Sequence, residues 1–329
     1  MSRPHPARTA LAAAGEALAT VAAGLAAALA DLFRRRPRGP WPRLGFVGML
    51  EAVALLLLAA GLTAAAMIFV DPLILGLRLR VPAWLATLAD RLTDLGYSGM
   101  VLWPLGIAIV CVVAAMPRFA ARGEDMARRV AASVLARLGF LFLSVGVVGL
   151  AVSLVKHFIG RARPMAAFFL SGPDRHLTFD VMVWKSSYAS FPSGHATTAF
   201  AAAVAFGALF PRLRWPLVAL AAVVAVTRVV LGSHYPSDVI AGAVLGTAFA
   251  LFMVKAFAAR RLVFKVDADG RIAPMAGPRA RRLGALLCGA LASGASPSTA
   301  FPSPPAGDAP SAAPTGAADL PAFLKEARS

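Results

Sequence analysis

Residues 46–70 read FVGMLEAVALLLLAAGLTAAAMIFV, and Glu51 carries the only charged side chain in this run. An α-helix rises about 1.5 Å per residue, so the run is long enough to cross the roughly 30 Å hydrocarbon core of a bilayer. Asp71 and Pro72 follow directly and favour a helix end there. The stretch therefore predicts a membrane-spanning helix and sets the class of fold for the chain.

The composition of the whole chain agrees with this class. Of 329 residues, 59% are hydrophobic and 15% are charged, and the mean hydropathy is +0.72. Soluble globular domains carry more charge and lack long apolar runs. Five further runs are apolar enough to span a membrane: about 97–116, 138–155, 192–210, 216–231 and 239–257. We expect an all-α, polytopic membrane helical bundle of about six transmembrane helices.

The formal net charge of +17 would suggest nucleic-acid binding in a soluble protein. Here most of the Lys and Arg residues fall on one side of the predicted spans, and basic residues are enriched in cytoplasmic loops. We therefore interpret the charge as a topology signal, with the bilayer as partner and no nucleic acid. Both termini and the basic loop around 118–129 should be cytoplasmic, and the loop 161–190 should lie outside.

Three regions follow from the spans. Residues 1–45 form a basic cytoplasmic arm, in which the Ala-rich stretch 9–32 is predicted to be an interfacial helix, with an additional span as the alternative. Residues 46–257 form the membrane domain. Residues 258–329 form a cytoplasmic tail that is first basic and then, because it is rich in Ala, Pro, Ser and Gly, disordered.

Shorter features are open to two interpretations. The amphipathic segment 84–95 is predicted to lie in the interface as a connector, and steering of a lipid substrate is the alternative. Arg161 could contact a headgroup or anchor the interface. His176 should face solvent in the outer loop. Cys111 and Cys288 are too few and too far apart for a disulfide framework or a metal motif.

Three polar clusters reach the same membrane face when the spans are placed in order: 156–164, 191–195 and 228–238. Ionisable groups at membrane depth are costly, so they are suspected of function. Each residue alone has an ordinary explanation, such as a lysine that snorkels at a helix end. The meeting of all three clusters predicts a site.

The residue types in these clusters suit a dianionic phosphate. Lys156, Arg163 and Arg228 supply three cations, and guanidinium groups match phosphate oxygens. Ser193 and Gly194 stand where a helix begins, so its free N–H groups and positive dipole would add to an anion site. No cluster of Asp or Glu stands in these segments, so we expect neither a metal ion nor another cofactor.

A nucleophile and an acid complete the set. Asp238 lies four residues after His234, so a helical turn would place the carboxylate beside the imidazole. A carboxylate that holds one ring nitrogen leaves the other free to attack. His195 can protonate the leaving oxygen and later activate water.

These patterns read K-x6-R-P from Lys156, P-S-G-H from Pro192 and R-x5-H-x3-D from Arg228. They resemble the three signature motifs of the type 2 phosphatidic acid phosphatase family, which is related to the vanadium-dependent haloperoxidases, over residues 97–257. Thr227 stands where the family usually has Ser. The resemblance implies that His234 is phosphorylated, Asp238 is its partner and His195 is the proton donor. It also implies a phosphate cradle made of Lys156, Arg163, Ser193, Gly194 and Arg228.

The expected function is hydrolysis of a lipid phosphomonoester or diphosphate through a phosphohistidine, in a bacterial inner membrane with the site facing the periplasm. A lipid phosphotransferase on the same site is one alternative, and a catalytically silent lipid-binding or transport protein is another. Phosphatidic acid, phosphatidylglycerol phosphate, polyprenyl diphosphate and lipid A all remain open as substrates, and so does the oligomeric state.

Overall fold

A computed structural model describes residues 15–16, 19–24, 26, 46–121, 125–267, 269–279, 281 and 284. Whether the stretch 9–32 forms a span, and whether the end of the tail is disordered, are questions that lie mostly outside these residues. The elements are α2 (Phe46–Ala65), α3 (Leu77–Arg80), α4 (Ala83–Thr93), α5 (Ser98–Ala121), α6 (Asp125–Ile159), α7 (Pro164–Phe168), α8 (Gly194–Leu209), α9 (Arg214–Val230), α10 (Pro236–Ala259), β1 (Phe264–Val266) and β2 (Ile272–Pro274).

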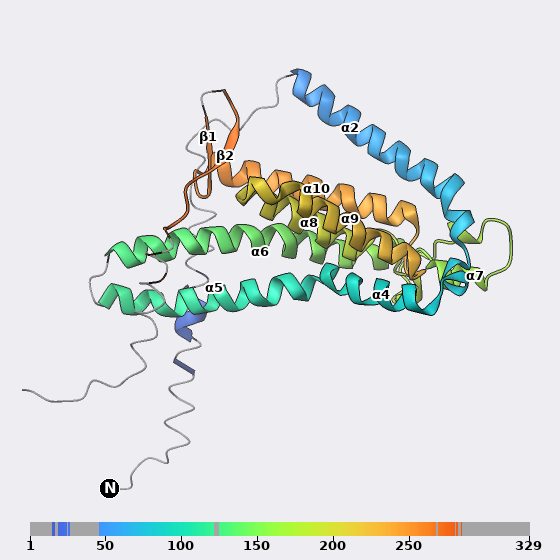
Figure 1. Ribbon diagram of the computed structural model, residues 1–329, viewed down its shortest axis with the longest axis horizontal. Coiled ribbons are helices and arrows are strands. Elements are labelled where there is room, and N and C mark those ends of the chain that lie inside the picture. The colour runs from blue at the N-terminus through green and yellow to red at the C-terminus, as the bar shows by residue number, and fades with distance from the viewer. Residues whose placement is uncertain are drawn as a thin grey trace, which may run out of the picture.

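The long helices lie side by side in an elongated bundle (Figure 1). In the described residues, five helical stretches are long and apolar enough to cross a membrane, with α4 and α5 counted as one stretch. Helix α8 is equally apolar but shorter, with 16 residues. The expected all-α polytopic bundle of about six helices is confirmed, and the chain is an integral membrane protein.

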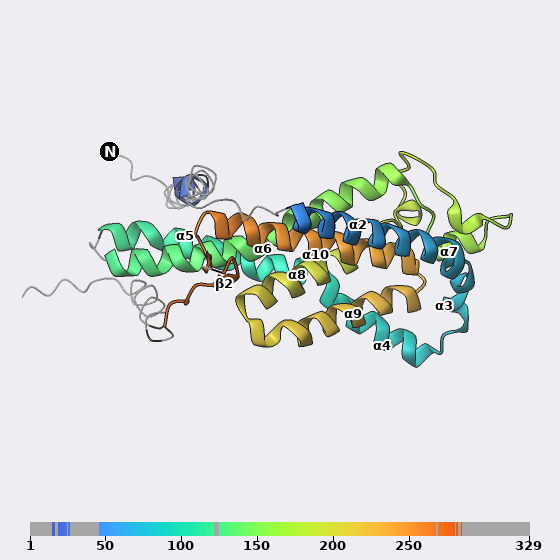
Figure 2. The same ribbon diagram turned by 90° about the horizontal axis from the view of Figure 1, so that it is seen from above.

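Helix α8 lies at the centre and packs against α6, α9 and α10 (Figure 2). Its closest approach is to α10, where Gly242 and Gly246 form a G-x-x-x-G pair. A methyl group on Gly246 would collide with the backbone carbonyl of Thr197 in α8. Small residues at this spacing let two membrane helices approach closely. The contact matters because both helices begin at the polar end of the bundle.

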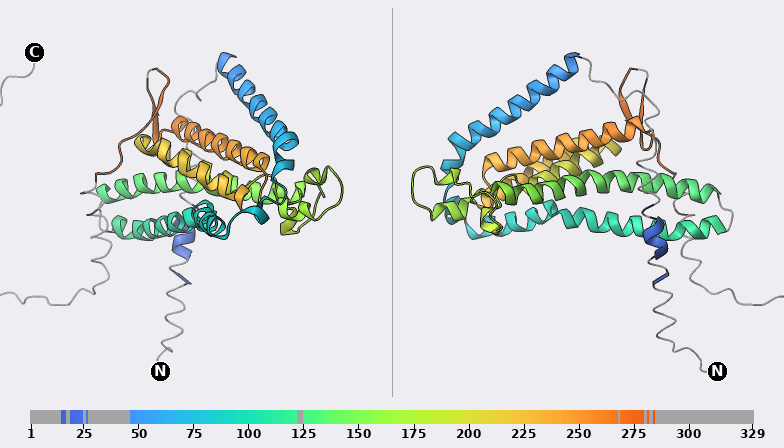
Figure 3. Two further views of the ribbon diagram at one scale, coloured as in Figure 1. Left: turned by 45° about the vertical axis from the view of Figure 1, so that its right-hand side comes forward. Right: turned by 180° about the vertical axis from the view of Figure 1, so that it is seen from behind.

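Helix α2 diverges from α10 toward its own N-terminal end (Figure 3). Its leucines project outward, and Leu55 and Leu57 are 65% and 66% exposed. Such a surface suits contact with lipid chains, which are as apolar as leucine. A short π-helix (Ala66–Val70) and a 3-10 turn (Asp71–Ile74) follow it, and they bring Asp71 back to the bundle.

Two connections differ from the prediction. The basic loop expected near 118–129 is mostly helical, because α5 continues to Ala121 and α6 begins at Asp125. At 35 residues, α6 is roughly 50 Å long and extends well beyond the hydrocarbon core. Helix α4 is amphipathic as expected, but Ala86, Ala89 and Thr93 are buried and the helix packs against α9. It belongs to the bundle instead of lying only in the interface.

The segment after α10 also differs from the basic tail that we expected. Strands β1 and β2 form an antiparallel hairpin in which Phe264 pairs with Pro274. Val263 and Phe264 are buried, and the Phe264 ring meets that of Phe140 in α6 edge-on at 5.0 Å between centroids. The ordered unit therefore continues past residue 257 and includes this hairpin.

Candidate active site

The three polar clusters lie at the end of the bundle that carries α7, opposite the β hairpin (Figure 1). Lys156 occupies the last turn of α6, Arg228 the last turn of α9, and Asp238 the first turn of α10. His195, in the first turn of α8, lies within electrostatic range of His234, Arg228, Arg163 and Lys156. The structure thus brings together the residues that the sequence placed on one face.

His234 lies in the short connection between α9 and α10, with only 3% of its surface exposed. Its Nδ1 atom is 2.7 Å from the backbone carbonyl oxygen of Ser190. The nearest oxygen of Asp238 is 3.6 Å away, which is too long for a hydrogen bond. The expected carboxylate contact is therefore replaced by a carbonyl. Because a carbonyl only accepts, Nδ1 carries the proton, and the lone pair of Nε2 is free.

Asp238 acts on the histidine through Ser190. Its Oδ2 atom accepts hydrogen bonds from the Ser190 hydroxyl at 2.5 Å and from the Tyr235 backbone N–H at 2.9 Å. The Ser190 carbonyl oxygen thus accepts a hydrogen bond from the His234 imidazole, and the Ser190 hydroxyl donates one to the Asp238 carboxylate. Ser190, two residues before the P-S-G-H motif, was not predicted, because its contact with His234 uses a backbone carbonyl that every residue has.

Arg161 is completely buried at the centre of this network. Its guanidinium donates to Asp238 at 2.5 Å, to Asp71 at 2.8 Å and to the Ser237 hydroxyl at 2.7 Å. It also lies 4.1 Å from the centroid of the Tyr235 ring. The predicted roles of headgroup contact or interface anchoring are wrong, because no part of the Arg161 side chain is exposed. Asp71, which the sequence analysis took only as a helix end, is its second carboxylate partner.

The turn between α6 and α7 positions Arg161. Gly160 adopts φ +64°, and a Cβ there would overlap the Asp180 carbonyl, so glycine is required. The carbonyl of His176 accepts a hydrogen bond from Arg161 at 3.0 Å. His176 is only 5% exposed, so the expectation that it faces solvent is wrong.

The cations that could hold a phosphate are not paired in this way. The Nε atoms of Arg163 and Arg228 are buried and have no hydrogen-bond partner among the described residues. Arg228 uses its Nη1 atom to donate to Thr93 at 3.0 Å, which ties it to α4. Arg161 already faces the charges of Asp71 and Asp238, so Lys156, Arg163 and Arg228 remain as the positive charges that surround His195 and His234.

The start of α8 adds a further positive element. Ser193 is its N-cap, and its hydroxyl accepts a hydrogen bond from the Ala196 N–H at 3.5 Å. The Ser193 N–H donates to the backbone carbonyl of Asp238 at 3.0 Å, which fixes the start of α8 against the start of α10. The first turn of α8, which begins with Gly194 and His195, therefore adds free N–H groups and the positive end of the helix dipole to the anion site formed by the cations.

Burial sets the protonation state of His234. Desolvation lowers its pKa below the ordinary value of 6.5, and the nearby Asp238 opposes this shift without overcoming it. The imidazole is therefore neutral at physiological pH. A neutral ring with its proton on Nδ1 can act as a nucleophile through Nε2.

The segment that contains the site is similar to known proteins. Residues 137–262 match the PAP2 superfamily. The matched segment contains every residue of the three predicted clusters, whereas Asp71 and Thr93 precede it. No solved structure matches the chain.

Curated relatives are bacterial phosphatases. The lipid A 1-phosphatase of Rhizobium johnstonii is 43% identical over 144 residues, which is 44% of this chain and 55% of that protein. The lipid A 1-phosphatase of Rhizobium etli is 41% identical over 148 residues, which is 45% of this chain and 62% of that protein. A decaprenylphosphoryl-5-phosphoribose phosphatase of Mycobacterium tuberculosis is 40% identical over 93 residues, which is 28% of this chain and 46% of that protein. The chain thus spans about half the length of these relatives.

Proposed function

We propose that this protein is a membrane lipid phosphatase that hydrolyses a phosphomonoester through a phosphohistidine on His234. The observation that carries the proposal is the pair of buried, unpartnered guanidinium Nε atoms of Arg163 and Arg228 beside a neutral histidine. Buried donors without partners are rare and costly. A phosphate dianion would satisfy both donors and place phosphorus within reach of Nε2.

The reaction follows from the residues in two steps. Nε2 of His234 attacks phosphorus, the bond from phosphorus to the lipid oxygen breaks, and His195 gives its proton to that oxygen. Water then attacks the phosphohistidine, His195 takes a proton from it, the P–N bond breaks and inorganic phosphate leaves. Throughout, the Ser190 carbonyl holds the Nδ1 proton, and the positive charge that develops on the ring faces Asp238 at 3.6 Å.

The relatives narrow the substrate. Those with the highest identity are named for the 1-phosphate of lipid A, and another for a phosphorylated decaprenyl sugar. We infer that the substrate is a phosphate carried on a sugar lipid, with lipid A as the first compound to test. The site then faces the periplasm of a bacterial inner membrane, with the membrane domain ending near residue 257 and the N-terminal arm and the tail in the cytoplasm.

The test is phosphate release by the purified protein from lipid A, phosphatidic acid, phosphatidylglycerol phosphate and a polyprenyl diphosphate. An acid-labile phosphoenzyme should be trapped with wild type and be absent from His234→Ala. Activity should survive EDTA, because the cradle consists of cations. Undiminished trapping in His234→Ala would overturn the assignment, and substrate binding without phosphate release would favour the silent lipid-binding alternative.

A further inference from the structure

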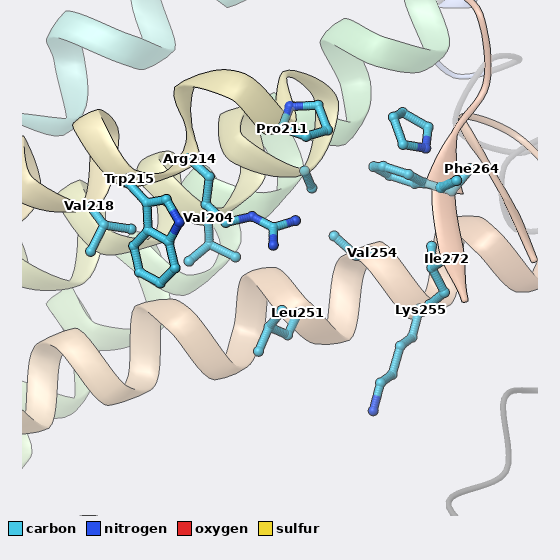
Figure 4. Close-up of a pocket in the computed structure, with 13 residues that line it drawn as sticks. Val204, Pro211, Arg214, Trp215, Val218, Leu251, Val254, Lys255, Phe264 and Ile272 are labelled. Carbon is cyan, nitrogen blue, oxygen red and sulfur yellow. The ribbon is translucent and has the colours of Figure 1, made fainter. Parts of the chain in front are cut away.

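A groove lies at the end of the bundle opposite the catalytic loops (Figure 4). It has a volume of about 600 Å³, which is within the range of ligand sites. Helices α8, α9 and α10 and the β hairpin all contribute to it. The lining includes Val204, Arg214, Trp215, Lys255, Phe264 and Ile272.

The walls of the groove are apolar, and its two charged lining residues are both cations. In Figure 4 the Arg214 side chain extends from α9 over the groove, between Val204 and Val254. Its stem passes Gly207 of α8, where an added Cβ would come within 3.4 Å of the Arg214 Cγ. Neither Arg214 nor Lys255 has a hydrogen-bond or ion-pair partner in the part of the chain that the structure describes.

The position of Arg214 adds to the positive potential. It is the first residue of α9, where the helix dipole is positive, and the first turn of α9 holds no acidic residue. A cation at this place opposes the dipole, so helix stability does not explain it. Trp215, 76% exposed, stands at the mouth, and indole rings favour the level of the headgroups.

We propose that this groove binds one anionic phospholipid, taken from the leaflet that faces away from the catalytic loops. Its phosphate lies at the Arg214 guanidinium, Lys255 adds positive charge on the α10 side of the groove, and one acyl chain follows the wall made by Val204, Leu251 and Ile272. The combination of an apolar wall with two unpaired cations among the lining residues matches the two parts of a lipid, and basic pockets between membrane helices bind such headgroups. A free anion would leave the apolar wall uncovered.

The experiment measures thermal unfolding of the full-length protein in neutral detergent, with inorganic phosphate present to occupy the catalytic cradle. Phosphatidylglycerol should raise the unfolding midpoint more than phosphatidylcholine with the same chains. In the Arg214→Gln, Lys255→Gln double variant, about 30-fold more phosphatidylglycerol should be needed for the same rise, because each cation near the surface adds roughly a factor of five. Arg212→Gln, an exposed neighbour that does not line the groove, should respond as wild type does.

Three results would overturn the proposal. Equal stabilisation by phosphatidylcholine would show that the occupant is apolar only. An unchanged response of the double variant would place the anionic lipid elsewhere. An equal effect of glycerol phosphate without chains would assign the cations to a free anion. The double variant should keep wild-type phosphatase activity, because the groove and the catalytic loops lie at opposite ends of the bundle, and this activity shows that the variant is folded.

Discussion

At the scale of single residues, the two histidines have different positions and should fail differently. His195 stands in the first turn of α8, half-buried and within electrostatic range of His234. In the proposed reaction it protonates the leaving oxygen, a step that an alkyl leaving group needs and nitrophenolate does not. His195→Ala should therefore lose about 100-fold or more against a lipid phosphate and much less against nitrophenyl phosphate. The two kcat ratios to wild type test this, and equal losses on both substrates would contradict the role.

The lowered pKa of His234 predicts a pH profile. Because burial holds the pKa below 6.5, the neutral nucleophile persists as pH falls through 6.5. The acid limb of kcat/KM, corrected for the ionisation of free substrate near pH 6, should lie below that value, because kcat/KM reports the free enzyme. Asp238, Arg163 and Arg228 are the charged groups that act on the ring. Protonation of His234 should abolish phosphoenzyme formation, and an acid limb centred above pH 6.5 would contradict the prediction.

The same shift affects stability. An unfolded chain protonates this histidine near 6.5, whereas the folded chain does so only at lower pH. The contribution of neutral His234 to the free energy of unfolding is therefore fully present above about pH 6.5, and it is lost as the pH falls toward and through the pKa of the folded state. Kinetic measurements at acid pH should thus be paired with a check that the protein remains folded.

At the scale of elements, the Asp71–Arg161–Asp238 network joins the turn after α2 to the start of α10. All three side chains are fully buried. Removing one charge of such a group is strongly destabilising, by about 3–5 kcal/mol. Asp71→Asn should therefore lower the unfolding temperature. It should also lower kcat more than it raises KM, because Arg161 positions Asp238 and Ser190 without belonging to the proposed phosphate cradle.

The matched control is Asp174→Asn, since Asp174 is an exposed carboxylate in the outer loop. It should change neither the stability nor the kinetics. If Asp71→Asn lowered only the unfolding temperature and left kcat unchanged, Asp71 would be structural alone. An Arg161→Lys variant that kept the wild-type kcat would show that the planar, forked guanidinium of arginine is not required at this position.

The contact between α8 and α10 gives a second prediction at this scale. Gly246→Ala places a methyl group against the Thr197 backbone, which cannot yield as a flexible side chain could. The two helices must separate, and this moves His195 relative to His234. Stability should fall by about 1–3 kcal/mol, the usual cost of overpacking, together with a loss of activity. Gly139→Ala is the control, because no atom lies within 4 Å of its Cβ position.

The sequence predicts local features and misses long-range pairings. The length and charge of a span are local properties, so the sequence predicts the spans. The order of the spans then predicts that the clusters containing Lys156, His195 and His234 lie on one face of the membrane. Arg161 and Asp71 are 90 residues apart, and nothing near either one indicates that they meet. Ser190 contributes a carbonyl to His234, and every residue has a carbonyl, so no residue type marks that role. The β hairpin was missed because its strands have only three residues each.

At the scale of the whole molecule, the proposed function requires a defined orientation. The catalytic loops must face the side where the lipid phosphate is displayed, and the basic residues near the hairpin, among them Arg260 and Arg261, indicate that the opposite end is cytoplasmic. Ser171, in the loop after α7, and Asp269, in the hairpin turn, are both exposed. These two positions therefore report the two faces.

The prediction is that Ser171→Cys reacts with a membrane-impermeant maleimide in intact cells, whereas Asp269→Cys reacts only after permeabilisation. Both are made in a chain in which Cys111 and Cys288 are replaced by serine, since Cys111 is exposed and would add background. Phosphatase activity of each variant confirms that it is folded. Labelling of Asp269→Cys alone in intact cells would reverse the orientation and place the catalytic loops in the cytoplasm. A phosphate displayed on the periplasmic leaflet would then be out of reach, so the substrate proposal depends on this result.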